Sequence, residues 1–189
     1  MSTQELLQLI QAKIDEGYTD FEINGCGQHN NGGSSWARDK GKTLNFYVKN
    51  PGQRVGAMGM KGTRIIVEGS VPADTGWLNS GAEIVVKGDS GDTTAHCAAS
   101  GEIYIGGRVG TRSGALMKHD PRFKIPGFWV LKNTGSFSFE FMGGGIAVVC
   151  GYDCDSLESV LGKGSCGGMV GGTVYVRGKA DNLSACVEI

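Results

Sequence analysis

Residues 102–107 read EIYIGG, a short alternating apolar run that ends in two glycines and continues as RVGTRSGA to residue 115. A strand that runs into a glycine-rich turn is typical of phosphate-binding loops. The spacing does not fit, because a dinucleotide fingerprint needs G-x-G-x-x-G and a P-loop needs Gly-Lys-Ser/Thr. The glycines fall instead at Gly106, Gly107, Gly110 and Gly114. The stretch therefore needs another explanation, and the rest of the chain supplies one.

The same kind of run occurs seven times, each ending in glycine or asparagine. The runs are NFYVKN (45–50), RIIVEG (64–69), EIVVKG (83–88), EIYIGG (102–107), FWVLKN (128–133), IAVVCG (146–151) and TVYVRG (173–178). Aligned on their last residues, they are separated by 19, 19, 19, 26, 18 and 27 positions. A fixed period with one strand per unit indicates a repeat architecture. EIYIGG is then one strand of seven, and its glycines end that strand.

Composition favours the same interpretation. Glycine accounts for 33 of 189 residues, and hydrophobic residues make up 40% of the chain. Collagen needs a three-residue period, and a disordered chain lacks compact apolar clusters, so both are excluded. We therefore predict an all-β fold, a right-handed single-stranded parallel β-helix of about seven coils with a period near 19 residues. The predicted organisation is residues 1–40 as an N-terminal helix with a connecting segment and residues 41–189 as the repeat domain.

The N-terminal helix is predicted from a capping box and helical spacing. Ser2 and Glu5 have the spacing of a capping box, and Leu6, Ile10 and Ile14 follow at four-residue intervals before Gly17. This amphipathic helix is expected to cap one end of the stack or to cover part of its surface.

Alternation along each strand divides its residues between two faces. The second and fourth residues of every run are apolar and are expected inside. The third residues should face outward, yet they are apolar or aromatic: Tyr47, Ile66, Val85, Tyr104, Val130, Val148 and Tyr175. An apolar stripe of this length is more than a monomer usually leaves exposed. We predict that it is a partner or self-association surface.

Charge and hydropathy exclude two classes of partner. The chain has 18 basic and 19 acidic residues, so its charge favours neither nucleic acid nor a membrane surface. No run approaches the roughly 18 apolar residues that a membrane-spanning helix needs. The N-terminus also lacks the pattern of a signal peptide, and a cytoplasmic location is expected.

Catalytic and metal-binding candidates are weak. Cys150, Cys154 and Cys166 match no usual zinc or iron–sulfur spacing. We therefore expect no catalytic, cofactor or metal residue in this chain, and no enzymatic activity of the chain by itself. Enzymatic use of His119 is the least favoured alternative.

An insertion interrupts the period at residues 115–127. It gathers five charged or titratable side chains, Lys118, His119, Asp120, Arg122 and Lys124. Insertions in repeat proteins form loops on one side of the stack. A solvated loop is the simplest interpretation, and a docking loop for a partner is the alternative.

Three segments together carry a family resemblance: SGEIYIGGRVGTRSGA (100–115), FEFMGGGIAVVCG (139–151) and GGMVGGTVYVRG (167–178). They resemble the GXGXG C-terminal domain of the glutamate synthase large subunit, over roughly residues 40 to 180. The resemblance implies a β-helix that acts as a non-catalytic scaffold between a glutaminase and an FMN-binding synthase, which here would be separate subunits. FMN and iron–sulfur clusters are implied only in those partners, so none is expected in this chain.

Two alternatives remain open at this point. A similar domain forms a subunit of formylmethanofuran dehydrogenase. The chain could also be a self-assembling structural or binding module without an enzyme partner, in which case the outer stripe would be a homo-oligomer interface.

Overall fold

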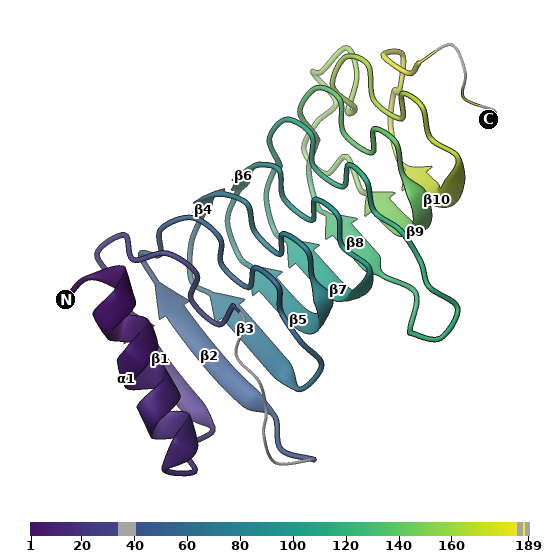
Figure 1. The fold of residues 1–189 in the computed structure, drawn as a ribbon. Coiled ribbons are helices and arrows are strands. Elements are labelled where there is room, and N and C mark those ends of the chain that lie inside the picture. Colours follow the sequence, from purple (N-terminus) through teal and green to yellow (C-terminus); the bar gives the residue numbers. More distant parts are fainter. Residues whose placement is uncertain (34–40, 185–186, 188–189) are drawn as a thin grey trace.

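The structure, a computed structural model, describes residues 1–33, 41–184 and 187. Helix α1 (Thr3–Asp15) precedes ten strands. Eight strands form one parallel sheet in the order β1-β2-β3-β5-β7-β8-β9-β10, and β4 pairs with β6 in a second, two-stranded sheet. The strands are β1 (Asp20–Asn24), β2 (Leu44–Lys49), β3 (Thr63–Val67), β4 (Val71–Ala73), β5 (Ser80–Val86), β6 (Ser90–Asp92), β7 (Ser100–Ile105), β8 (Gly127–Val130), β9 (Gly143–Val149) and β10 (Gly171–Val176). Figure 1 shows the large sheet as one wall of an elongated molecule, with the connecting segments stacked behind it.

The predicted fold class is wrong. In place of an all-β, seven-coil β-helix, the described residues form an eight-stranded parallel sheet with a short helix, and they do not close into a solenoid of strands. All seven predicted runs do supply strands to this sheet, and β1 adds an eighth. The segments that return from one strand to the next are mostly turns, with β4 and β6 as short exceptions.

The backbone conformation of the turns explains the error. The turns that lead into β3, β5, β7, β8, β9 and β10 each hold three residues with positive φ, spaced two apart: 54/56/58, 74/76/78, 93/95/97, 112/114/116, 137/139/141 and 164/166/168. A chain that visits the left-handed region at every second residue cannot be a β-strand. Its amides point alternately to the two neighbouring repeats: the Leu78 amide donates to the His96 carbonyl at 2.9 Å, and the Gly76 amide donates to the Val55 carbonyl at 2.8 Å. The turns therefore stack by hydrogen bonds of their own.

The core lies between the large sheet and the stacked turns. Strand register aligns one inward-facing row across the sheet, Ile23, Val48, Val67, Val86, Ile105, Val130 and Val149. All seven side chains are buried. Because seven of the eight strands, from β1 to β9, contribute to the same row, the core is continuous along this part of the stack.

Strand β8 sits one residue away from its predicted frame. Phe128 pairs with Ile103 and Trp129 pairs with Tyr104, so Trp129 faces out and Val130 faces in. Val130 is fully buried, whereas Trp129 is 36% exposed. The prediction treated Asn133 as equivalent to the terminal glycine Gly107. The Lys132 amide, however, is the one that donates to the Gly107 carbonyl, so Asn133 lies one position further along.

The turn before β9 shows how the core keeps its volume. In the turn before β5, a methyl group added to Gly76 would lie 2.5 Å from the Cδ1 atom of Ile103, an inward-facing residue of β7. Next to Gly114, in the turn before β8, the equivalent space is filled by the ring of Phe139 from the turn before β9. The residue of β9 that corresponds to Ile103 is the small Ala147. Large and small side chains have thus exchanged places between turn and strand, which preserves close packing.

Helix α1 closes the β1 end of the stack (Figure 1). Ser2 caps it: the Ser2 hydroxyl accepts from the Glu5 amide, and the Glu5 carboxylate accepts from the Ser2 amide. Ile10 and Ile14 are buried and join the same core cluster as Ile23. The helix therefore covers the end of the core rather than the outer stripe.

The boundary that was predicted near residue 40 can be compared with the strand pairing. β1 lies before that boundary and is hydrogen-bonded in parallel to β2, which lies after it.

No helix in the described part of the chain is long and apolar enough to cross a membrane.

Candidate interaction surface

The outer face of the large sheet carries a row of apolar and aromatic residues that differs from the predicted stripe at one position. Register places seven residues in a single row from β2 to β10: Tyr47, Ile66, Val85, Tyr104, Trp129, Val148 and Tyr175. Trp129 occupies the position that was assigned to Val130, which lies in the core. We call this row the outer stripe. Its aromatic members are the most accessible, from 36% for Trp129 to 58% for Tyr175.

The centre of the outer stripe is held in a fixed arrangement. The rings of Tyr104 and Trp129 are stacked, with centroids 6.0 Å apart and planes 12° from parallel. The Trp129 indole Nε1 donates to the Glu102 carboxylate at 2.9 Å. Partial burial, followed by the negative charge of Glu102, raises the pKa of the Tyr104 hydroxyl. Tyr104 therefore stays neutral under ordinary conditions, and the pair offers two oriented aromatic rings to solvent.

Ion pairs flank the stripe and satisfy its charged neighbours. Arg64 pairs with Glu83 at 3.1 Å, on strands β3 and β5. Lys87 pairs with Glu68 at 2.6 Å. Exposed pairs of this kind contribute little to stability, roughly 0–1 kcal/mol. The four charged side chains beside the stripe are therefore already paired with one another across neighbouring strands.

The insertion is folded against both the sheet and the turns. On the sheet side, Lys124 pairs with Glu102 at 2.8 Å, and this hydrogen bond raises the pKa of the Lys124 ammonium. At its tip, Arg122 binds Asp120 at 2.5 Å and thereby lowers the pKa of the Asp120 carboxyl. The loop projects from the stack between β7 and β8 (Figure 1).

On its other side, the insertion forms a groove with the turns. The groove has a volume of about 440 Å³ and is lined by Met60, Ser80, Ala99, Ser100, Lys118, His119, Asp120 and Phe123. The His119 Nε2 atom lies 3.1 Å from the Phe123 carbonyl oxygen, which fixes the ring within the loop. Of the five predicted docking residues, Lys118, His119 and Asp120 line this groove, whereas Lys124 faces the sheet side.

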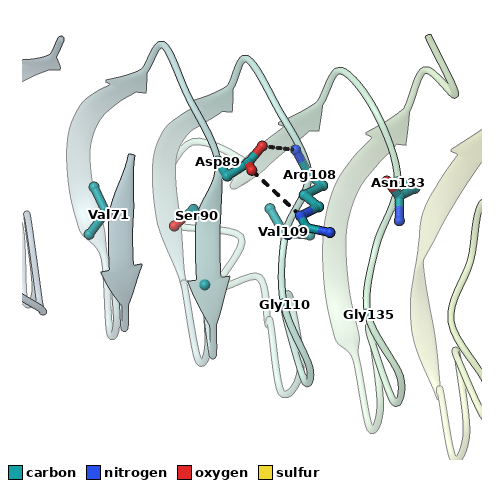
Figure 2. Close-up of a pocket in the computed structure, with 9 residues that line it drawn as sticks. Val71, Asp89, Ser90, Arg108, Val109, Gly110, Asn133 and Gly135 are labelled. Atoms are coloured by element: carbon teal, nitrogen blue, oxygen red, sulfur yellow. Dashed lines mark hydrogen bonds and ion pairs between the residues drawn. The ribbon is translucent and has the colours of Figure 1, made fainter. Parts of the chain in front are cut away.

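The glycine-rich turn after EIYIGG lines a separate hollow of about 370 Å³ (Figure 2). Figure 2 shows Asp89 turned toward Arg108 of the next repeat, where its carboxylate accepts from the Arg108 amide at 2.9 Å and lies 3.5 Å from the guanidinium Nε. The Val109 and Gly110 amides donate to the Asn133 and Ser90 carbonyls. A phosphate cradle needs unpaired amides and a free cation. Here those groups hold neighbouring repeats together, which agrees with a structural interpretation of the turn.

The cysteines do not assemble a metal site in the described part of the chain. No group of three or more His, Cys, Asp or Glu side chains that could hold a metal ion lies among those residues. Cys154 and Cys166 are buried, and burial raises the pKa of the Cys166 thiol to about 11. A thiol with that pKa is a poor ligand and a poor nucleophile near neutral pH.

Sequence reasoning missed Trp129 and Glu102 as members of this surface. The sequence did indicate the position of Trp129, because Pro126-Gly127 marks the residue at which this strand begins. Counting from Gly127 would have placed Phe128 and Val130 inside. Glu102 gave no such signal, since its bond to Trp129 spans the insertion.

The parallel sheet, the stacked positive-φ turns and the aromatic outer stripe define a glycine-rich repeat domain with an extended apolar and aromatic outer face. The chain belongs to the GXGXG family, since the model of the GXGXG motif matches residues 24–189. It is also 30% identical over 142 residues to the glutamate synthase [NADPH] large chain of Bacillus subtilis (strain 168). That match covers 69% of this chain and only 8% of the relative. The predicted resemblance to a glutamate synthase GXGXG domain is thereby confirmed. No solved structure matches the chain at a significant level.

Proposed function

We propose that this protein is a non-catalytic scaffold subunit of a glutamate synthase-like complex in the cytoplasm. It would hold a glutaminase-like subunit and an FMN-binding synthase-like subunit together, so that ammonia released by the first is used by the second. The chain corresponds to 8% of its glutamate synthase relative, so the chemistry of such a complex would reside in the partner subunits, together with any FMN or iron–sulfur cluster.

One observation carries the proposal, the outer stripe centred on Tyr104 and Trp129. Interface hot spots are enriched in Trp and Tyr near the centre of the contact. Stacking and the Glu102 hydrogen bond hold both rings in place before any partner arrives. Such preorganisation reduces the entropy lost on binding. A face of this kind suits a stable subunit contact.

The test is affinity isolation of the tagged protein from its native cells at moderate salt, comparing wild type with Trp129→Ala. Recovery of a glutaminase-like and a synthase-like chain is expected with the wild type. Loss of a hot-spot residue typically costs about 2 kcal/mol or more, which is roughly 30-fold in affinity. At least one partner should therefore be lost with Trp129→Ala. Tyr18→Ala removes an aromatic ring that is 56% exposed outside the sheet and should retain both partners.

Two results would overturn the proposal. One is recovery of the wild-type chain alone, as a discrete homo-oligomer, which would make the outer stripe a self-association surface. The other is unchanged recovery of both partners with Trp129→Ala, at an unchanged unfolding temperature.

A further inference from the structure

A second apolar surface lies on the stacked turns. The last residue of each positive-φ triplet is half-buried or exposed, and five successive turns place Met58, Leu78, Cys97, Leu116 and Phe141 side by side. Backbone hydrogen bonds link these turns, from Met58 to the Trp77 carbonyl and onward to Leu116, which donates to the Glu140 carbonyl. Leu116 is 43% exposed and Phe141 is 56% exposed. We call this row the turn ridge.

The groove beside the insertion runs along this ridge. Two residues after the first four ridge residues comes a second row, Met60, Ser80, Ala99 and Lys118, and all four line the groove. Ser80 and Ala99 are small, and Phe123 of the insertion also lines the groove. We call the turn ridge and the groove beside it, taken together, the trough; both extend across successive repeats.

Lys118 is the one charged residue in the two rows. No carboxylate lies within ion-pair distance of its ammonium in the described part of the chain, whereas Asp120 is bound to Arg122 and Lys124 to Glu102. Glu140, the acid nearest the ridge in sequence, pairs with Arg112 at 3.9 Å. A cation without a partner in an apolar trough is complementary to a ligand that carries apolar side chains and a carboxylate.

The repeat spacing favours a helix as the occupant. Neighbouring parallel strands lie about 4.8 Å apart, and successive turns of an α-helix rise about 5.4 Å. A helix laid along the trough would therefore place its i, i+4 and i+7 side chains over successive repeats, which is the usual helix-in-groove mode of recognition.

We propose that the turn ridge and its groove bind an acidic amphipathic helix of a partner protein. This surface is separate from the outer stripe, and the insertion stands at the edge between them. The inference is independent of which enzyme the complex contains, since it depends only on the trough and on Lys118.

The test is photo-crosslinking in the native cells, with p-benzoylphenylalanine in place of Leu116 in the full chain. The control carries the same probe in place of Leu9, which is exposed on α1. We expect a specific adduct from position 116 with another protein, mapped to a segment that has apolar residues at helical spacing and at least one carboxylate. Lys118→Glu should reduce that adduct at least tenfold, and Lys118→Arg should preserve it. Because Lys118 is exposed, neither change should alter the circular dichroism of the chain.

Three outcomes would overturn the inference: no adduct above the Leu9 control, an adduct with a second copy of this chain, or an adduct that is insensitive to Lys118→Glu. The same probe in place of Tyr104 reports on the outer stripe alone. Failure of the scaffold proposal and failure of the trough proposal therefore give different crosslinking patterns.

Discussion

At the residue scale, the glycines have different structural roles: some allow a close approach of two backbones, and others have open space around the Cβ position. Gly91, Gly110, Gly135 and Gly162 form a column in which each would place a Cβ atom against the backbone of the preceding repeat. For Gly91 the added carbon would lie 1.7 Å from the Pro72 carbonyl oxygen, across the β4–β6 pair. Gly69, in contrast, has open space around its Cβ position and no positive φ.

This difference predicts the outcome of alanine substitution. Gly91→Ala should reduce the free energy of unfolding by about 3 kcal/mol, because a backbone must move to admit the methyl group. Gly69→Ala should change it by less than about 0.5 kcal/mol. Gly17→Ala, where φ is +96° but nothing lies within 4 Å, should cost about 1–2 kcal/mol for the left-handed conformation alone. Urea unfolding of the three variants measures these values, and equal losses at Gly91 and Gly69 would contradict the close-approach argument.

Much of this detail lies beyond sequence reasoning. The period and the alternation of apolar residues predicted which segments form strands and which residues of most strands face inward. They could not predict the positive-φ triplets, because 13 of the 18 triplet positions hold residues other than glycine, such as Arg54, Leu78 and Phe137. These conformations are imposed by hydrogen bonds to neighbouring repeats, which are tertiary contacts. The error in β8 had a related cause, since the end of a strand is set by its partner rather than by its own last residue.

At the element scale, α1 protects an end of the sheet that would otherwise be exposed. Edge strands and open core ends are prone to pair with other chains. The sequence was sufficient to predict this helix, because its capping box and its four-residue apolar spacing are local signals. Where the helix would lie was left open, and burial of Ile10 and Ile14 places it on the core.

The energetic contribution of α1 can be tested on its two faces. Ile14→Ala should lower the free energy of unfolding by about 3 kcal/mol, since it removes buried methyl groups from the end of the core. Leu9→Ala, on the exposed face of the same helix, should change it by less than about 0.5 kcal/mol. Both variants keep the helix propensity high, so denaturant unfolding compares packing alone. If Leu9→Ala were as costly as Ile14→Ala, the helix would pack on the stack by a different face.

At the scale of the whole molecule, the stack presents two apolar surfaces that meet at the insertion. The outer stripe follows the sheet, and the trough follows the turns. Both run along the same axis, because successive repeats contribute one residue each to the outer stripe and to the turn ridge. A rigid stack with two faces suits a protein that holds two others at a fixed separation, and rigidity requires that the repeats unfold together.

The continuous core predicts such cooperativity, although repeat architectures can also open locally from their ends. One cluster of buried residues extends from Ile10 at the β1 end to Cys166 in the last turn. Cys166 is 3% exposed, and burial raises the pKa of its thiol to about 11, so this thiol remains protonated at pH 8 and should be alkylated only when the structure opens. If opening is global, Ile14→Ala should accelerate alkylation of Cys166 by roughly 100-fold, the factor that corresponds to about 3 kcal/mol. Iodoacetamide labelling followed by peptide mass spectrometry measures this rate, with Leu9→Ala as the control. An unchanged Cys166 rate in Ile14→Ala would mean that the β10 end opens on its own, and a scaffold of fixed geometry would then depend on its partners for rigidity at that end.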